Sequence, residues 1–266
     1  RWIAIVVLAV LGAMLVNTIL TNDGFRWDVV GKYLFSGPVL NGLRNTLVLT
    51  VLSMLIGIFG GIALAVMRLS PNPVLSYVAG LYIWLFRGTP LIAQLLFWNF
   101  LAALYPRLSL GIPFGPEFVS FDTNQLINQF TACLLGLGLN EAAYMAEIVR
   151  GGLQSLSKGQ TEAAASLGLG YWQTQVKIVL PQALGTVVPS IMNNFISLFK
   201  DTSLVTIVSL YELTGALSLA VGSDPNWRPF KIEAYIFIAA IYFTCCFAMS
   251  RYSLWIERRL AVGKAR

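Results

Sequence analysis

The sequence predicts an all-α membrane protein with six transmembrane helices. Hydrophobic residues make up 57% of the 266-residue chain and charged residues 11%, and its mean hydropathy of +0.72 excludes an ordinary soluble domain. Apolar stretches near the roughly 20 residues that a bilayer-spanning helix requires recur along the chain. The six candidate spans cover about residues 2–20, 43–67, 89–105, 128–149, 183–208 and 232–255.

The first two spans carry different signals. Residues 2–20 are long enough to span and lack a small-residue cleavage pattern, so we expect a retained helix rather than a removed signal peptide. In the second span, Gly57, Gly60 and Gly61 predict close contact with another helix, because glycine lets two backbones approach where lipid gives no hydrophobic drive.

The third span adjoins a break in the apolar pattern. Hydrophobic residues lie on both sides of the sequence Arg87-Gly88-Thr89-Pro90, and proline disfavours a continuous helix there. We therefore expect residues 71–86 to form an interfacial helix that leads into the span. A single longer helix through this region is the alternative.

Charged residues distinguish the later spans. Glu141 and Glu147 lie in the fourth span, and the i, i+3 spacing of Glu147 and Arg150 predicts an ion pair near its end. The fifth span is interrupted by the adjacent charges Lys200 and Asp201. Charged groups inside a span cost on the order of 2.5 to 3.5 kcal/mol on insertion scales, so these two residues are candidates for function.

The distribution of basic residues predicts the orientation of the chain. With six spans, eleven Lys and Arg residues fall on the side of the termini and six on the other side. The excess favours a multi-pass protein of the inner or plasma membrane with both termini in the cytoplasm. The same bias accounts for the net charge of +6 without a nucleic-acid partner. The outer loops then cover residues 21–41, 106–127 and 211–231.

Several activities are excluded by what the sequence lacks. Histidine is absent, which removes Ser-His triads and HExxH metal sites, and no nucleophile motif is recognisable. The three cysteines show no CxxC spacing, so we expect buried thiols and no metal site. A G-x4-GK[ST] motif is also absent, so we expect a chain that is not an ATPase or any other enzyme and that holds no cofactor.

A polar segment between the fourth and fifth spans has a distinctive spacing. It reads Glu162-Ala163-Ala164, three residues, Gly168, nine residues, then Ile178-x-Leu180-Pro181. Alanines favour a helix with a thin surface, and a glutamate near the helix start can cap it or form an ion pair. Glycine permits the turn that ends the helix, and proline is tolerated in the first turn of the next one. An ordinary amphipathic connector is the alternative.

This spacing resembles the EAA motif of permease subunits of binding-protein-dependent ABC importers. The chain is further similar to the polar-amino-acid permeases among them at residues 87–91, 143–152 and 200–204. The resemblance as a whole covers roughly residues 40–256. It implies a type I importer permease core of five helices plus one N-terminal helix. Residues 1–40 would form that helix and an external loop, residues 41–256 the core with a cytoplasmic coupling loop at 151–181, and residues 257–266 a basic cytoplasmic tail.

The resemblance also implies partners. Two ATP-binding cassette subunits, which hold ATP and Mg, would grip the coupling loops of this chain and of a second permease subunit, the same or homologous. An extracytoplasmic amino-acid-binding protein would deliver the solute, and residues 106–116 and 224–228 are alternatives to plain connectors as its docking surface. Membrane lipid would surround the assembly. The ATPase-coupling residues implied by the motif are Glu162, Ala163, Ala164, Gly168, Ile178, Leu180 and Pro181.

A second set of residues predicts a solute site around the charged pair of the fifth span. On helical spacing Asn194 and Asp201 share a face, and a helix break after Asp201 would free backbone groups to meet a solute. A cation, an anion and neutral donors together suit a zwitterion. The predicted substrate-binding residues are Asn194, Ser197, Lys200, Asp201, Thr202, Ser203 and Gln94. Alternatively, Lys200 and Asp201 pair with each other or with a neighbouring helix and only stabilise packing.

The expected function is therefore an ATP-driven importer permease for polar amino acids. Basic-amino-acid relatives place an acidic residue about two turns before the charged pair, where this chain has Asn194, and this favours a neutral or acidic amino acid. An ion-coupled secondary transporter of a small polar solute, with Lys200 and Asp201 as coupling residues, is the alternative.

Overall fold

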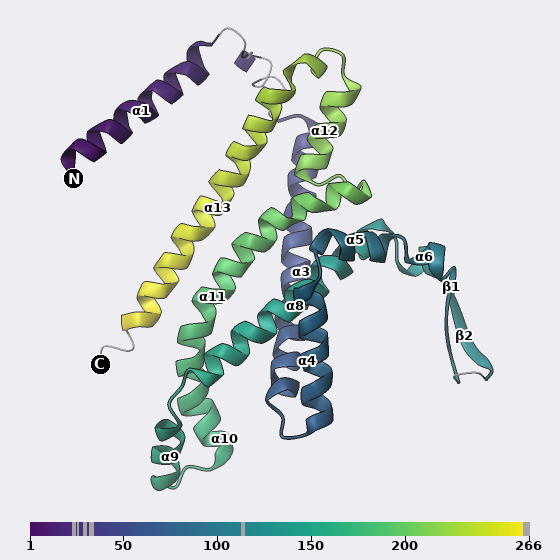
Figure 1. Cartoon of the computed structure of the whole chain (residues 1–266), viewed down its shortest axis with the longest axis vertical. Helices are drawn as coiled ribbons and strands as arrows, with labels where there is room; N and C mark the ends of the chain where they lie inside the picture. The colour runs from purple at the N-terminus through teal and green to yellow at the C-terminus, as the bar shows by residue number, and fades with distance from the viewer. Residues whose placement is uncertain (23–24, 26, 29–30, 32–34, 113–114, 263–266) are drawn as a thin grey trace.

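The computed structural model describes residues 1–22, 25, 27–28, 31, 35–112 and 115–262, which are mostly helical (Figure 1). The longer helices are α1 (Trp2–Thr21), α3 (Gly37–Leu69), α4 (Pro73–Gly88), α5 (Leu91–Asn99), α8 (Gln129–Gln154), α9 (Lys158–Ser166), α11 (Leu180–Asp201), α12 (Leu213–Ser223) and α13 (Lys231–Val262). The shorter elements are α6 (Leu101–Leu104), α7 (Thr123–Leu126), α10 (Tyr171–Thr174), the π-helical turn η1 (Gln175–Val179), the 3-10 helices η2 (Thr202–Val208) and η3 (Arg228–Phe230), and the strands β1 (Arg107–Gly111) and β2 (Glu117–Asp122).

The predicted all-α membrane fold is confirmed. Among the described residues, four helical segments are long and apolar enough to cross a membrane, namely α1, α3, α8 and Arg228–Arg259. Two bent units pass the same test, the pair α4 and α5 and the pair Tyr171–Val208 and α12, which gives six spans if each is counted once. No residue of α1 is buried, and Figure 1 shows this helix apart from the others.

Helices α3 and α8 pack closely over much of their length, as the glycines of α3 predict. A Cβ added at Gly57 would lie 2.4 Å from Cγ of Glu141, and one at Gly61 would lie 2.3 Å from Cβ of Met145. Any side chain at either position would therefore push the two helices apart. The buried side chains of Leu49, Leu95 and Leu137 and their neighbours from α11 and η2 form one core cluster with this helix pair.

The bounds predicted for the third span are wrong. Helix α5 has nine residues and α6 has four, and α5 is bent by 102° from α4, so residues 89–105 form no continuous helix. The alternative of one long helix is wrong for the same reason. Thr89 is extended because the following Pro90 disfavours helical geometry in the residue before it. The run before the break, α4, packs against α3 and α8.

Two predicted outer loops contain regular structure that was not foreseen. Strands β1 and β2 form an antiparallel hairpin within residues 106–127. Helix α12 occupies the middle of residues 211–231, and the fully buried Glu212 caps its start. The Glu212 carboxylate accepts hydrogen bonds from the Gly215 N–H and the Thr206 and Tyr242 hydroxyls, each at 2.8 Å, so α12 is tied to η2 and α13.

The end regions are described only in part. The predicted loop at 21–41 includes residues 23–24, 26, 29–30 and 32–34, which lie outside the described residues, as do residues 263–266 of the predicted basic tail. Helix α13 continues through Val262, so the described part of that tail extends the helix.

Candidate functional site

A polar cavity of about 400 Å³ lies between α8, α11 and the junction of α4 and α5. Its lining residues are Thr89, Pro90, Leu91, Asn140, Glu141, Tyr144, Asn194, Ser197, Asp201 and Leu204. Three residues predicted from the sequence meet here, namely Asn194, Ser197 and Asp201. Of the others, Leu204 lies in η2 just after the charged pair, and the rest come from α8 and the bend, which are remote from that pair in sequence.

Two carboxylates face this cavity, and none of the described residues that line it is cationic. Glu141 is only 5% exposed, and its carboxylate accepts a hydrogen bond from the amide of Asn194. It reaches this place because Gly57 of α3 leaves no side chain behind it. Asp201 at the end of α11 is the second carboxylate. The lining is therefore acidic, and it suits a solute that carries positive charge.

Glu141 was missed as a site residue although a signal for it existed. A carboxylate within a predicted span is a candidate for function by the same rule that singled out Asp201. The expectation of a neutral or acidic solute rested on Asn194 alone. Because the structure places an acidic side chain of α8 against that amide, the argument from Asn194 loses its basis.

The amino end of α5 opens on the same cavity. Pro90 precedes the helix without a side-chain cap, and Leu91 is its first residue. Backbone N–H groups in the first turn of a helix have no intrahelical acceptor, and the helix dipole gives this end partial positive charge. The lining of the cavity thus combines an electropositive helix end with acidic side chains.

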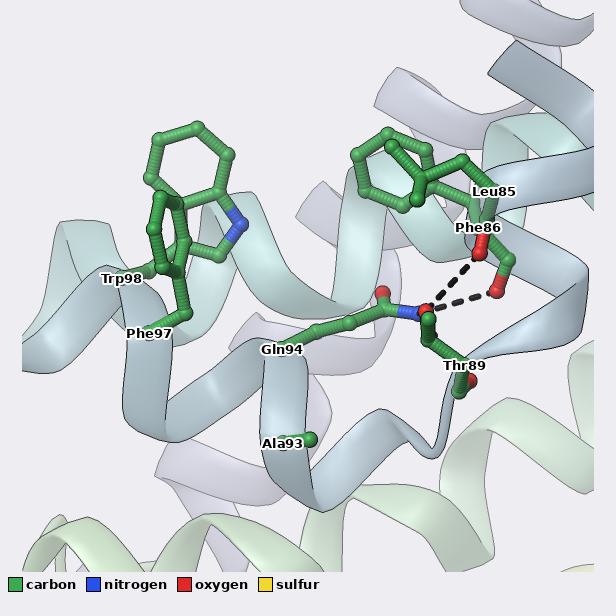
Figure 2. A pocket seen from close by; sticks show the side chains of 7 residues that line it. All are labelled: Leu85, Phe86, Thr89, Ala93, Gln94, Phe97 and Trp98. Atoms are coloured by element: carbon green, nitrogen blue, oxygen red, sulfur yellow. Dashed lines mark hydrogen bonds between the residues drawn. The ribbon is translucent and has the colours of Figure 1, made fainter. Parts of the chain in front are cut away.

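Gln94 lies outside the lining of the polar cavity. Figure 2 shows its side chain in a smaller apolar pocket, pointing back toward Phe86 and Thr89. Its amide donates to the Phe86 carbonyl at 2.9 Å and to the Thr89 hydroxyl at 2.8 Å, and its oxygen accepts from Asn140 at 3.2 Å. The first bond satisfies a backbone carbonyl near the bend, and together the three connect α5 to α4 and α8, so Gln94 stabilises the bend.

Three further predicted residues also lie outside the lining. Lys200 is exposed, and within the described part of the chain it makes no ion pair within 4 Å, so a Lys200–Asp201 bridge is not present. Thr202 is fully buried and donates its hydroxyl to the Phe199 carbonyl at 2.7 Å. Ser203 is half-buried in η2. The helix does change geometry after Asp201, from α to 3-10, as the interruption in the sequence predicted.

The predicted ion pair on α8 is present and is part of a larger cluster. Arg150 binds Glu147 through two nitrogens, at 3.1 and 2.6 Å. Arg87, on the last turn of α4, lies 3.8 Å from the same carboxylate and 5.4 Å from the ring centroid of Tyr144. Tyr144 in turn lines the polar cavity.

The EAA segment forms the predicted short helix, α9, and the turn after it. Gly168 has a φ of +76°, a conformation that other residues rarely adopt. Glu162 does not cap the helix; Ser157 does so, accepting from the Gly159 N–H. Ala163 and Glu162 are exposed, whereas Ala164 is buried against the rest of the loop.

The second half of the motif begins a long helical stretch. Pro181 is in the first turn of α11, but α10 and the π-helical turn η1 lead into it without a break. A wider π turn accommodates a proline ring, which removes one backbone donor. Ile178 is half-buried and Leu180 is 45% exposed.

Large apolar side chains gather on the exposed surface around this segment. Leu167, Tyr171, Trp172 and Val176 are between 60% and 80% exposed. Figure 1 shows α9 and α10 together at the end of α8, beyond the rest of the bundle. An exposed apolar group of this size typically marks a protein interface.

A polar cavity at the junction of a discontinuous helix within an apolar bundle is typical of membrane transport proteins. Residues 57–262 match the family model described as the binding-protein-dependent transport system inner membrane component. The chain belongs to this family, and the resemblance drawn from its EAA motif is confirmed.

Named relatives agree with this assignment. The arginine transport system permease protein ArgU of Corynebacterium glutamicum is 43% identical over 271 residues, which cover 100% of this chain and 82% of that protein. The inner membrane amino-acid ABC transporter permease protein YhdY of Escherichia coli is 41% identical, over 90% of this chain and 62% of that protein. A solved structure of an amino acid ABC transporter with histidines is similar with a TM-score of 0.72 and 32% identity, and covers 86% of this chain and 97% of its own.

Proposed function

We propose that the chain is the permease subunit of an ATP-driven importer for amino acids with a cationic side chain. The observation that carries this proposal is the pair of carboxylates, Glu141 and Asp201, in a cavity whose lining, over the part of the chain that the structure describes, contains no cationic side chain. The name of the 43% identical Corynebacterium relative, an arginine transport permease, supports the same class of solute.

The three charged groups of such a solute each have a complementary position. Asp201 binds the α-ammonium group, which all amino acids share. Glu141, oriented by Asn194, binds the guanidinium or ammonium of the side chain. The amino end of α5 at Leu91 receives the α-carboxylate, as half-helix ends do in other transporters.

The surface formed by α9, Gly168 and the exposed apolar residues around them, here called the coupling surface, supports an ATP-driven mechanism. We propose that α9, Gly168 and the exposed apolar residues around them engage a separate ATP-binding cassette subunit, which holds ATP and Mg. Both termini would then be cytoplasmic, a second permease subunit would complete the path, and an extracytoplasmic binding protein would deliver the solute. Two ATPase subunits, one for each permease, would drive alternating access by binding the two orientations with different affinity.

The test is transport by the complex purified from its native membrane through a tag on this chain. In liposomes that also contain the binding protein, labelled arginine should enter only with ATP, and vanadate should stop its entry. The alternative, an ion-coupled secondary transporter, predicts uptake that resists vanadate and collapses with an uncoupler. ATP-driven uptake of glutamine or glutamate in preference to arginine would refute the assigned solute class.

A further inference from the structure

The charged cluster of Arg87, Glu147 and Arg150 connects two helices beside the polar cavity. Glu147 binds Arg150 of its own helix at 2.6 Å and faces Arg87 of α4 at 3.8 Å. Arg87 also lies over the ring of Tyr144, 5.4 Å from its centroid. Because Tyr144 lines the cavity, Arg87 contacts both a wall of the cavity and the charge cluster beyond it.

The cluster lies between the cavity and the coupling surface. Along α8 the cavity residues Glu141 and Tyr144 are followed by Glu147, Arg150 and Gln154 at intervals of three or four, so each of these residues lies next to the following one on the helix surface. Arg150 also donates to Gln154, the last residue of α8, at 2.6 Å. At about 1.5 Å per residue, this end is about 15 Å beyond Tyr144, and α9 begins shortly after it.

From these contacts we propose that Arg87 is a positioning residue that closes the cavity toward α9 by holding Tyr144 and Glu147 together. The proposal rests on the proposed function, since it assigns the exit of that pathway. Opening requires α4 and α8 to separate at this point. Movement of α9 can produce this separation because only residues 155–157 connect α9 to α8.

The weak ion pair between Arg87 and Glu147 and the net positive charge of the cluster suit a gate for a cation. The Arg87 and Glu147 side chains are 43% and 24% exposed, and ion pairs so accessible to solvent are weak enough to open reversibly. Two guanidinium groups surround one carboxylate, so the closed cluster is net positive. It therefore repels a cationic solute in the cavity more than a neutral one.

The experiment measures leak through the intact complex in liposomes loaded with labelled arginine or glutamine, without ATP. Arg87→Gln should raise arginine efflux about three- to tenfold, the factor expected for losing an accessible ion pair and a cation–π contact. Glutamine efflux should rise less, because only the arginine leak also gains from the lost positive charge. Arg251→Gln, at an exposed arginine of α13, is the control and should change neither rate.

Glu147→Gln provides an independent variant if Arg87→Gln does not assemble. It removes the ion pair between Arg87 and α8 and leaves the Arg87–Tyr144 contact, and it should also raise the ATP-independent leak, with more ATP hydrolysed per arginine transported. If the assembled variants leak no faster than the wild-type complex, the proposed gate is overturned. Equal increases for arginine and glutamine in the Arg87→Gln complex would overturn the electrostatic part. A wild-type complex that transports no amino acid would instead refute the proposed function, so the two failures are distinguishable.

Discussion

Replacing Glu141 with Gln tests the chemistry of the cavity most sharply. The change keeps the shape of the side chain and its contact with Asn194, since an amide oxygen can still accept the hydrogen bond, but it removes one of two negative charges. Glu141 is 5% exposed, so solvent screens its charge poorly. A hydrogen bond to a charged group contributes about 1.5 to 3 kcal/mol, which corresponds to a factor of about 10 to 150 in affinity.

Only solutes with a cationic side chain should suffer this loss. We therefore expect the Glu141→Gln complex to take up arginine with a KM at least about tenfold higher, while glutamine uptake, if measurable, stays the same or improves. The assay is competition between labelled arginine and unlabelled glutamine in liposomes, with ATPase assembly measured in the same preparation. A similar loss for arginine and glutamine would refute the role of Glu141 in side-chain recognition.

Three other predictions concern binding, coupling and packing. Asp201→Asn should lower the uptake of all amino acids by a similar factor of about 10 to 100 without affecting assembly, because the α-ammonium group is common to them; direct binding measurements would check this. Gly168→Val should abolish solute-stimulated ATP hydrolysis but not membrane insertion, since a left-handed φ costs a non-glycine residue about 1 to 2 kcal/mol; unchanged stimulation would contradict it. Gly57→Leu should lower the Tm of the detergent-solubilised protein by overpacking α3 against Glu141, whereas Gly12→Leu, in open space on α1, should not.

The bundle itself was largely predictable from the sequence, because the length of an apolar stretch and the spacing of its glycines are both features of one short segment of the chain. Close packing at Gly57 and the turn at Gly168 both follow from the lack of a side chain. The change of helix type after Asp201 also followed from its local pattern. The 102° bend was only half foreseen, because Pro90 predicts a break but not its angle. Bonds from Gln94 and Asn140, which are set by tertiary packing, stabilise that geometry.

The candidate site was less predictable because it is assembled from three separate segments. Asn194, Ser197 and Asp201 could be grouped by helical spacing along one stretch, but the spacing of α11 says nothing about what faces it. The decisive carboxylate, Glu141, comes from α8 and joins Asn194 across 53 positions of sequence. Lys200 was included as a charged residue within a predicted span, yet it is exposed and is not among the residues that line the cavity.

The most direct test of the account is to identify what contacts α9 in the working complex. A photo-crosslinking amino acid at the exposed Ala163 should join the chain to an ATP-binding cassette subunit, with a yield that changes when ATP is added. The same group at Leu110, exposed on the β1–β2 hairpin, is the control and should not react with that subunit. Crosslinking of Ala163 to a protein outside the cytoplasm, or labelling of this position by an impermeant reagent added externally, would contradict the account.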